Sequence, residues 1–141
     1  RTLMARAVPA LVWSAAVSFV TATIIEVTGT WQPGIIRAEG AWIVATAVLV
    51  AIGLLGAAIS GDGRIGAAVV GAVWIFEEGL KSWFLKTGIL HPLFIFATSR
   101  FEPRVTNWWV NRFVLLVIAA LFATAAWRLL ARPNRLVRGS R

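Results

Sequence analysis

Long apolar runs alternate with short charged connections along this chain. The runs Ala7–Ile25 and Gly40–Gly61 contain no charged residue, and Ile65–Phe76 and Phe113–Trp127 are also free of charge. About 20 mostly apolar residues in a helix cross the hydrocarbon layer of a membrane. The pattern therefore predicts an all-α integral membrane protein, a single membrane domain built as a bundle of four transmembrane helices. The expected helices cover about 7–27, 40–61, 65–86 and 108–130.

The connections between these runs differ in kind. Asp62 and Gly63 predict a tight turn, which would make the second and third helices an antiparallel hairpin. The stretch Ile89–Thr98 is apolar but too short to span a bilayer, and it predicts a short re-entrant or interfacial segment between helices three and four. A basic tail over 131–141 follows the last helix.

Small residues recur at three- and four-residue spacings in the expected hairpin. Small side chains let membrane helices approach closely, so we expect the two sets to face each other. The alternative is two spans that are simply rich in small residues. The sets are Gly53, Gly56, Ala57 and Ser60 in the second helix, and Ala67, Ala68, Gly71 and Ala72 in the third.

Composition points to lipid as the surrounding solvent. Of the 141 residues, 59% are hydrophobic and 14% are charged, whereas soluble domains average about 45–50% and about 25%. The net charge is +8, but the basic residues gather at the ends of apolar runs, which favours lipid headgroups as partners and not nucleic acid. The distribution of lysine and arginine favours cytoplasmic termini in a bacterial inner membrane. Because the chain begins with Arg1, we expect further residues before it.

Charged residues interrupt the expected third helix at Glu77, Glu78 and Lys81. On a helix both glutamates can reach Lys81, because they precede it by four and three positions. Three interpretations stay open. The helix leaves the membrane at this point, or the cluster anchors a partner subunit, or it forms an ion or substrate site, since acids at membrane depth are costly and are functional candidates.

Glu26 closes the first apolar run in the stretch TIIEVTGT. A single carboxylate in the first of four short helices resembles the small multidrug resistance transporters. In that family such a glutamate exchanges protons for cationic drugs, so the resemblance implies a transport role for Glu26. Here the third helix is more charged and the connection before the fourth is longer, and we do not assign the chain to the family. The alternative is a helix-end carboxylate in contact with water.

The connection before the fourth helix is rich in arginine and tryptophan. Arginine and tryptophan at the end of an apolar run are typical of headgroup contacts. The residues that we expect to contact lipid headgroups are Arg100, Arg104, Arg112, Trp108 and Trp109. His91 lies in the apolar segment before them, where we expect it to bond a backbone carbonyl. The alternative is a metal or cofactor ligand completed by another chain.

Catalytic motifs are not recognisable in the sequence. The chain has no cysteine and one histidine, and it carries no phosphate loop, nucleophile elbow or zinc motif. We therefore predict no metal, no cofactor and no enzymatic activity. The expected function is a small non-catalytic accessory subunit of a larger membrane complex, with lipids and other membrane subunits as partners. The alternatives are a homo-oligomeric proton-coupled transporter or channel acting through Glu26 or Glu77 and Glu78, and a lipid-binding or lipid-modifying protein.

Overall fold

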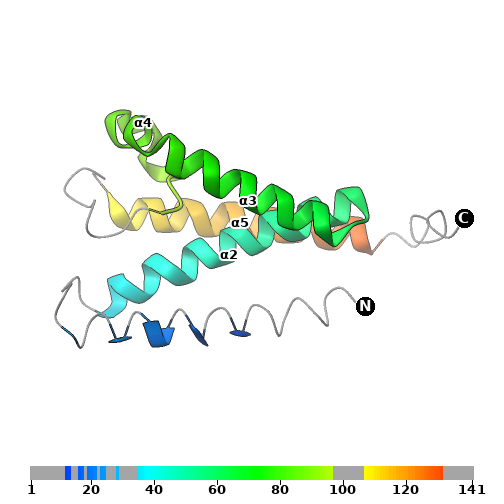
Figure 1. Cartoon of the computed structure of the whole chain (residues 1–141), viewed down its shortest axis with the longest axis horizontal. Coiled ribbons are helices and arrows are strands. Elements are labelled where there is room, and N and C mark those ends of the chain that lie inside the picture. Colours follow the sequence, from blue (N-terminus) through cyan, green and yellow to red (C-terminus); the bar gives the residue numbers. More distant parts are fainter. Residues whose placement is uncertain are drawn as a thin grey trace, which may run out of the picture.

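The structure is a computed structural model that describes residues 35–96 and 107–131, together with scattered positions between 12 and 28. The described part is helical throughout, as predicted (Figure 1). Most of the expected first helix, 7–27, and nearly all of the tail lie outside the described residues. The elements are α2 (Ile35–Ser60), α3 (Gly63–Gly79), α4 (Lys81–Lys86), the 3-10 helix η1 (Gly88–Leu93) and α5 (Trp108–Leu130).

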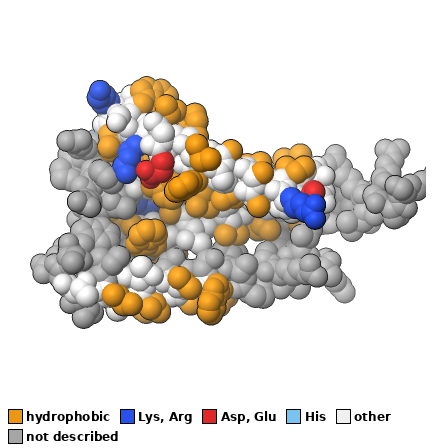
Figure 2. Space-filling model, in the orientation of Figure 1, with side chains coloured by type: hydrophobic (Ala, Val, Ile, Leu, Met, Phe, Trp, Pro, Cys, Tyr) orange, Lys and Arg blue, Asp and Glu red, His pale blue; other side chains and the backbone are white. Residues whose placement is uncertain are grey.

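Within the described residues, two helices are long and apolar enough to cross a membrane, whereas the sequence predicts four, the first of which lies mostly outside these residues. They are Gly40–Ser60 within α2 and Trp108–Leu130, which is the whole of α5. Only a minority of the residues in either helix is buried. Figure 2 shows hydrophobic side chains distributed over the outer surface of the described helices. Two long apolar helices with exposed apolar faces are compatible with a lipid environment.

The expected third helix, 65–86, is broken into two. It ends at Gly79 after 17 residues, and α4 begins at Lys81. Leu80 lies between them with φ −101° and ψ 11°, outside helical geometry, while its N–H still donates to the Phe76 carbonyl at 2.9 Å. Glycine is among the weakest helix formers, which makes Gly79 a natural place for the break. The separated α4 is only 6 residues long.

The turn between α2 and α3 is as tight as predicted. Gly61 adopts a positive φ of 76°, a conformation that glycine reaches at little cost. Asp62 then caps α3, because its Oδ1 accepts a hydrogen bond from the Arg64 N–H at 2.8 Å. A capping aspartate satisfies one of the N–H groups that a helix start leaves unpaired. The two helices therefore return antiparallel to each other.

Close packing in this hairpin depends on Gly66. A Cβ on Gly66 would clash with the Gly53 carbonyl oxygen and lie 3.0 Å from the Ala57 Cβ. The α2 side of the expected small-residue face is thus confirmed for Gly53 and Ala57, and Gly56 also lies against Gly66. The α3 side is wrong, since the residues named for it are exposed or face open space: Ala67, Ala68, Gly71 and Ala72. Spacing identifies small residues, but the turn decides which face of α3 meets α2.

The core lies where α5 and the segment after η1 pack on α2. Val48 and Leu115 are each 1% exposed and belong to one cluster with Ile95. Phe94 stacks on Phe84 of α4 with ring centroids 5.5 Å apart. The two residues that follow η1 therefore link α4 to the core between α2 and α5, at the α4 end of the molecule (Figure 1).

Candidate functional site

Buried polar side chains gather at this same end of the molecule. Among the described residues they are Glu77, His91, Asn111 and Arg112, with exposed fractions of 4%, 8%, 1% and 4%. Buried polar and charged groups are costly unless they are hydrogen-bonded. Their partners therefore indicate what the cluster does.

Glu77 binds the main chain after η1. Its Oε2 and Oε1 accept the Ile95 N–H at 3.0 and 3.3 Å, across 18 positions of sequence. The carboxylate also interacts electrostatically with the positive charge of Arg112. A hydrogen bond to an ionised group is stronger than one between neutral groups. Together, the N–H donor and the nearby guanidinium offset part of the cost of burying a carboxylate.

Asn111 binds the same segment from α5. Its Nδ2 donates to the His91 carbonyl at 2.7 Å and to the Phe94 carbonyl at 3.0 Å. A 3-10 helix leaves carbonyls at its end without a partner inside the helix. The His91 carbonyl also accepts the Phe94 N–H at 3.4 Å, so Asn111 adds a second hydrogen bond there, binds the carbonyl of the C-cap residue Phe94, and thereby fixes the end of η1 to α5.

Arg112 connects three elements. Its Nη1 donates to the Ile95 carbonyl at 3.1 Å and to the Ala41 carbonyl of α2 at 3.5 Å. The guanidinium carbon lies 5.2 Å from the centre of the Trp108 ring, a cation–π contact. Ile95 thus has its N–H bound by an acidic side chain and its carbonyl bound by a basic one.

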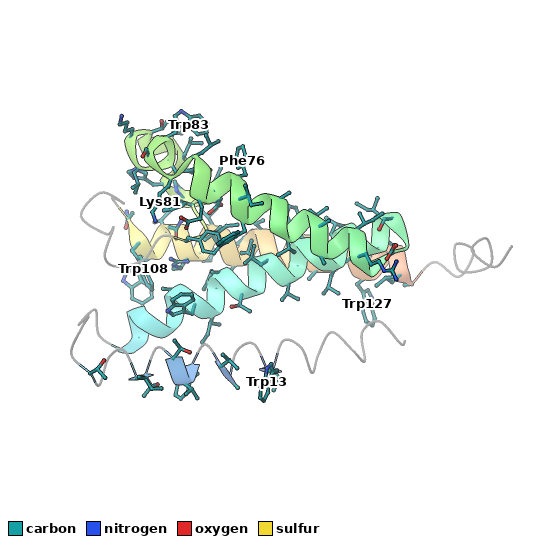
Figure 3. The ribbon with its side chains drawn as sticks, viewed as in Figure 1. Trp13, Phe76, Lys81, Trp83, Trp108 and Trp127 are labelled. Carbon is teal, nitrogen blue, oxygen red and sulfur yellow. The ribbon has the colours of Figure 1, made fainter. Side chains whose placement is uncertain are left out.

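Four buried polar atoms of this region have no hydrogen-bond partner within the part of the chain that the structure describes. They are Trp108 Nε1, Asn111 Oδ1, and both Nε and Nη2 of Arg112. Unpaired buried polar atoms are uncommon in folded proteins and call for an explanation. All four belong to the first two turns of α5, where Trp108 lies at the start of the helix (Figure 3).

The predicted cluster of Glu77, Glu78 and Lys81 is divided in the structure. Lys81 Nζ lies 3.6 Å from Glu78 Oε2, and these side chains are 32% and 42% exposed. Glu77 instead turns inward to Ile95. Adjacent residues on a helix point about 100° apart, so the two glutamates reach different surroundings. The expectation that both carboxylates meet Lys81 is therefore wrong for Glu77.

The expected headgroup residues also separate. Trp109 is 57% exposed, whereas Trp108 and Arg112 are only 3% and 4% exposed and therefore present little surface to a lipid headgroup. Arg100 and Arg104, like Glu26, lie outside the described residues. The inward direction follows from packing, because Trp108 lies against Gly40, where a Cβ would approach its ring to 2.9 Å.

His91 lies in η1, within the short apolar segment that the sequence predicts before the fourth helix. Its Nε2 is 3.3 Å from the Leu85 carbonyl oxygen, which agrees with the expected bond to a backbone carbonyl. Within residues 35–96 and 107–131, no three histidine, cysteine or acidic residues group together as a set of metal ligands.

Sequence reasoning missed the part of Asn111 in this network. The signal that could have identified it is an asparagine directly before an arginine in the first turns of an apolar helix, since polar groups at such positions usually face protein.

Comparisons with protein-family models, with curated proteins and with solved structures find no match to this chain.

Proposed function

We propose that the protein is a four-helix integral membrane protein that acts as a non-catalytic accessory subunit of a larger membrane complex. The membrane setting is supported by α2 and α5, which are long and apolar enough to span. In this proposal the third span combines α3 with α4, and the first corresponds to 7–27.

The observation that carries the proposal is the direction of the buried hydrogen bonds. Glu77, Asn111 and Arg112 all bind main-chain atoms of the segment around η1. Side chains used in this way hold the fold together. Proton transport through Glu77 would require this carboxylate to release and rebind protons while it holds the Ile95 N–H. The geometry therefore favours a structural role for Glu77 over the transport alternative.

The surface of α3 near α4 is the region that we assign to a partner subunit. Trp74, Ile75 and Phe76 are 53%, 66% and 55% exposed. The Glu78–Lys81 pair lies directly after them and is partly exposed. Figure 2 shows acidic and basic side chains side by side among hydrophobic ones near the α4 end. A charge pair on an apolar surface is costly in lipid, and a polar contact from a second protein would lower that cost.

The test is co-purification of partners from the native membrane in mild detergent. Trp74→Ala should reduce the partner recovered by at least about fivefold, because removing an aromatic anchor from an interface commonly costs more than 1 kcal/mol. Trp127→Ala is the matched control, since Trp127 is 58% exposed but lies near the far end of α5 (Figure 3). Equal partner recovery from both variants, each at wild-type stability, would count against the assigned surface.

A further inference from the structure

Two oppositely charged residues lie in one line along the outer face of α3. Arg64 and Glu78 are 14 positions apart, and Gly71 is at the midpoint. Seven residues make nearly two full turns of an α-helix, so these three positions point within about 40° of one another. Gly66, which packs against Gly53 of α2, points about 140° away from Gly71. The line of charges therefore faces away from α2.

The described part of the protein leaves this outer face of α3 uncovered. Arg64 is exposed, and the side chain of Glu78 is 42% exposed. Between them, Trp74 and Ile75 are 53% and 66% exposed, and no described atom lies within 4 Å of a Cβ placed on Gly71. Figure 2 shows acidic and basic side chains near both ends of α3 on the same face of the molecule. The face is thus apolar in the middle and charged at each end.

Membrane lipid alone is a poor environment for these two charges. Arg64 and Glu78 are about 21 Å apart along the helix axis, because an α-helix rises about 1.5 Å per residue. The hydrocarbon layer is about 30 Å thick, so a span that includes α3 cannot place both charges outside this layer. A charge inside it is costly unless it faces protein or water. A partner helix that brings the opposite charge to each end would lower this cost.

The charges of α3 complement those of a second α3 when the two helices are antiparallel. If such a pair crosses at Gly71, Arg64 of each copy lies opposite Glu78 of the other copy. In a parallel pair each charge would lie opposite its own equivalent, and like charges placed together weaken association. We propose that α3 forms this antiparallel contact with a second copy of the protein. The inference rests on the partner surface proposed above and names its occupant, and further subunits bind to the resulting pair.

An antiparallel contact between spans requires the two copies to enter the membrane in opposite orientations. The side with more lysine and arginine in its short loops usually becomes cytoplasmic. In the four-helix arrangement proposed above, eight of the 14 lysines and arginines lie on the side of the termini and six on the other side. This small difference gives only a weak preference, so both orientations are expected in one membrane.

The experiment is disulfide cross-linking in the native membrane, which suits this chain because it has no cysteine. Ala67 and Ile75 are symmetric about Gly71, so Ala67→Cys in one tagged copy should cross-link with Ile75→Cys in a second copy that carries another tag. A disulfide needs Cα atoms within about 7 Å. Two copies of the same variant place their cysteines about 12 Å apart along the axis, so neither variant should cross-link with itself. Leu121→Cys on α5, where Leu121 is 62% exposed, is the control and should cross-link with neither.

Charge reversal tests the pairing of Arg64 with Glu78. Arg64→Glu in both copies places two acids together at each end and should lower the yield of the cross-link about tenfold. Arg64→Glu in one copy and Glu78→Arg in the other brings opposite charges together again and should restore the yield. Arg128→Glu in both copies is the control, since Arg128 lies in the last turn of α5, and it should leave the yield unchanged.

Three results would overturn the antiparallel contact. The first is a cross-link of Ala67→Cys with itself, which indicates a parallel pair. The second is no cross-link between Ala67→Cys and Ile75→Cys when both are present in the membrane at the wild-type level. The third is an unchanged yield when Arg64→Glu is present in both copies. If the charge variants do not fold, the cysteine variants decide, because they keep both charges.

Native mass spectrometry separates this inference from the proposed accessory role. A complex that contains other proteins and a single copy of the chain contradicts the pair and leaves the accessory role intact. Two copies free of other proteins support the pair and contradict the accessory role. Two copies together with other proteins support both.

Discussion

At the scale of single residues, Ile95 is the point on which the described structure depends. Its N–H and carbonyl are bound by Glu77 of α3 and Arg112 of α5, and its side chain belongs to the core between α2 and α5. The main-chain groups of a single residue thus connect helices that are distant in sequence. Each of these side chains matters because the main-chain group that it binds is buried.

Glu77 and Glu78 should differ sharply in their effect on stability. Glu77→Ala leaves the buried Ile95 N–H unpaired and should lower the free energy of unfolding by about 2 kcal/mol. Glu78→Ala removes only a partly exposed ion pair and should cost at most about 1 kcal/mol. Denaturation of the two variants in the same detergent measures the difference. Equal losses would mean that Glu77 does not hold the segment.

Gly66 and Gly71 provide a second matched pair. Gly66→Ala places a methyl group against the Gly53 carbonyl and should destabilise the protein by about 1–3 kcal/mol through overpacking. Gly71→Ala meets nothing within 4 Å, and we expect unchanged or slightly higher stability because alanine favours helix. Thermal unfolding compares the two. A Gly66→Ala protein as stable as Gly71→Ala would contradict the close approach of α2 and α3.

At the scale of elements, η1 and the residues after it are held in place by side chains from α4 and from α5. Phe94 stacks on Phe84 of α4, while Asn111 of α5 binds the carbonyls of His91 and Phe94. The 3-10 helix is only 6 residues long. The conformational stability of this segment should therefore depend more on its hydrogen bonds to Asn111 than on the intrinsic helix propensity of its residues.

Asn111→Ala should loosen this segment while leaving the long helices intact. Loss of two hydrogen bonds at about 1 kcal/mol each predicts roughly thirtyfold faster amide exchange at residues 90–95. Exchange in α2 and in the centre of α5 should stay unchanged. Asn107→Ala is the control, because Asn107 makes no side-chain capping bond to α5. Hydrogen exchange by mass spectrometry reports both, and identical protection of 90–95 in the two variants would refute the assignment.

The elements that sequence reasoning located best are those with long uninterrupted apolar runs. The expected helix 108–130 coincides with α5, and the expected 40–61 corresponds to α2, which begins earlier at Ile35. The break at Gly79 was not predicted, since charge and apolarity alone continue the pattern to Lys86. The expected apolar segment at 89–98 does correspond to η1 and the residues after it, but its depth relative to a membrane stays a prediction.

The site was only half visible in the sequence for a physical reason. Glu77 was identified as a candidate functional residue because a charge in an apolar helix is costly, and this can be recognised without knowing which group the carboxylate binds. Its actual partner is a backbone N–H located 18 positions away, and main-chain groups carry no sequence signal. Similarly, the closeness of Arg112 to Trp108 in the sequence predicted that both residues contact lipid headgroups. The burial of Arg112 depends on the packing of Trp108 against Gly40, which spacing does not encode.

At the scale of the whole molecule, charge and apolar surface are distributed unequally. The described interior polar groups gather at the α4 end, together with the Glu78–Lys81 pair. The exposed apolar residues extend along the long apolar helices α2 and α5 and along α3. Lipid can cover the helices, but the ion pair beside Trp74 and Phe76 favours protein contact. We therefore propose that assembly with other subunits takes place at this end of the molecule.

Native mass spectrometry of the tagged protein, extracted from its own membrane in mild detergent, tests this central claim most directly. The account predicts complexes in which the chain is present with different proteins in a fixed ratio. It also predicts that Trp74→Ala weakens these complexes and Trp127→Ala does not. A protein that is recovered only as a homo-oligomer, stable and free of other subunits, would contradict the account and favour the transport alternative.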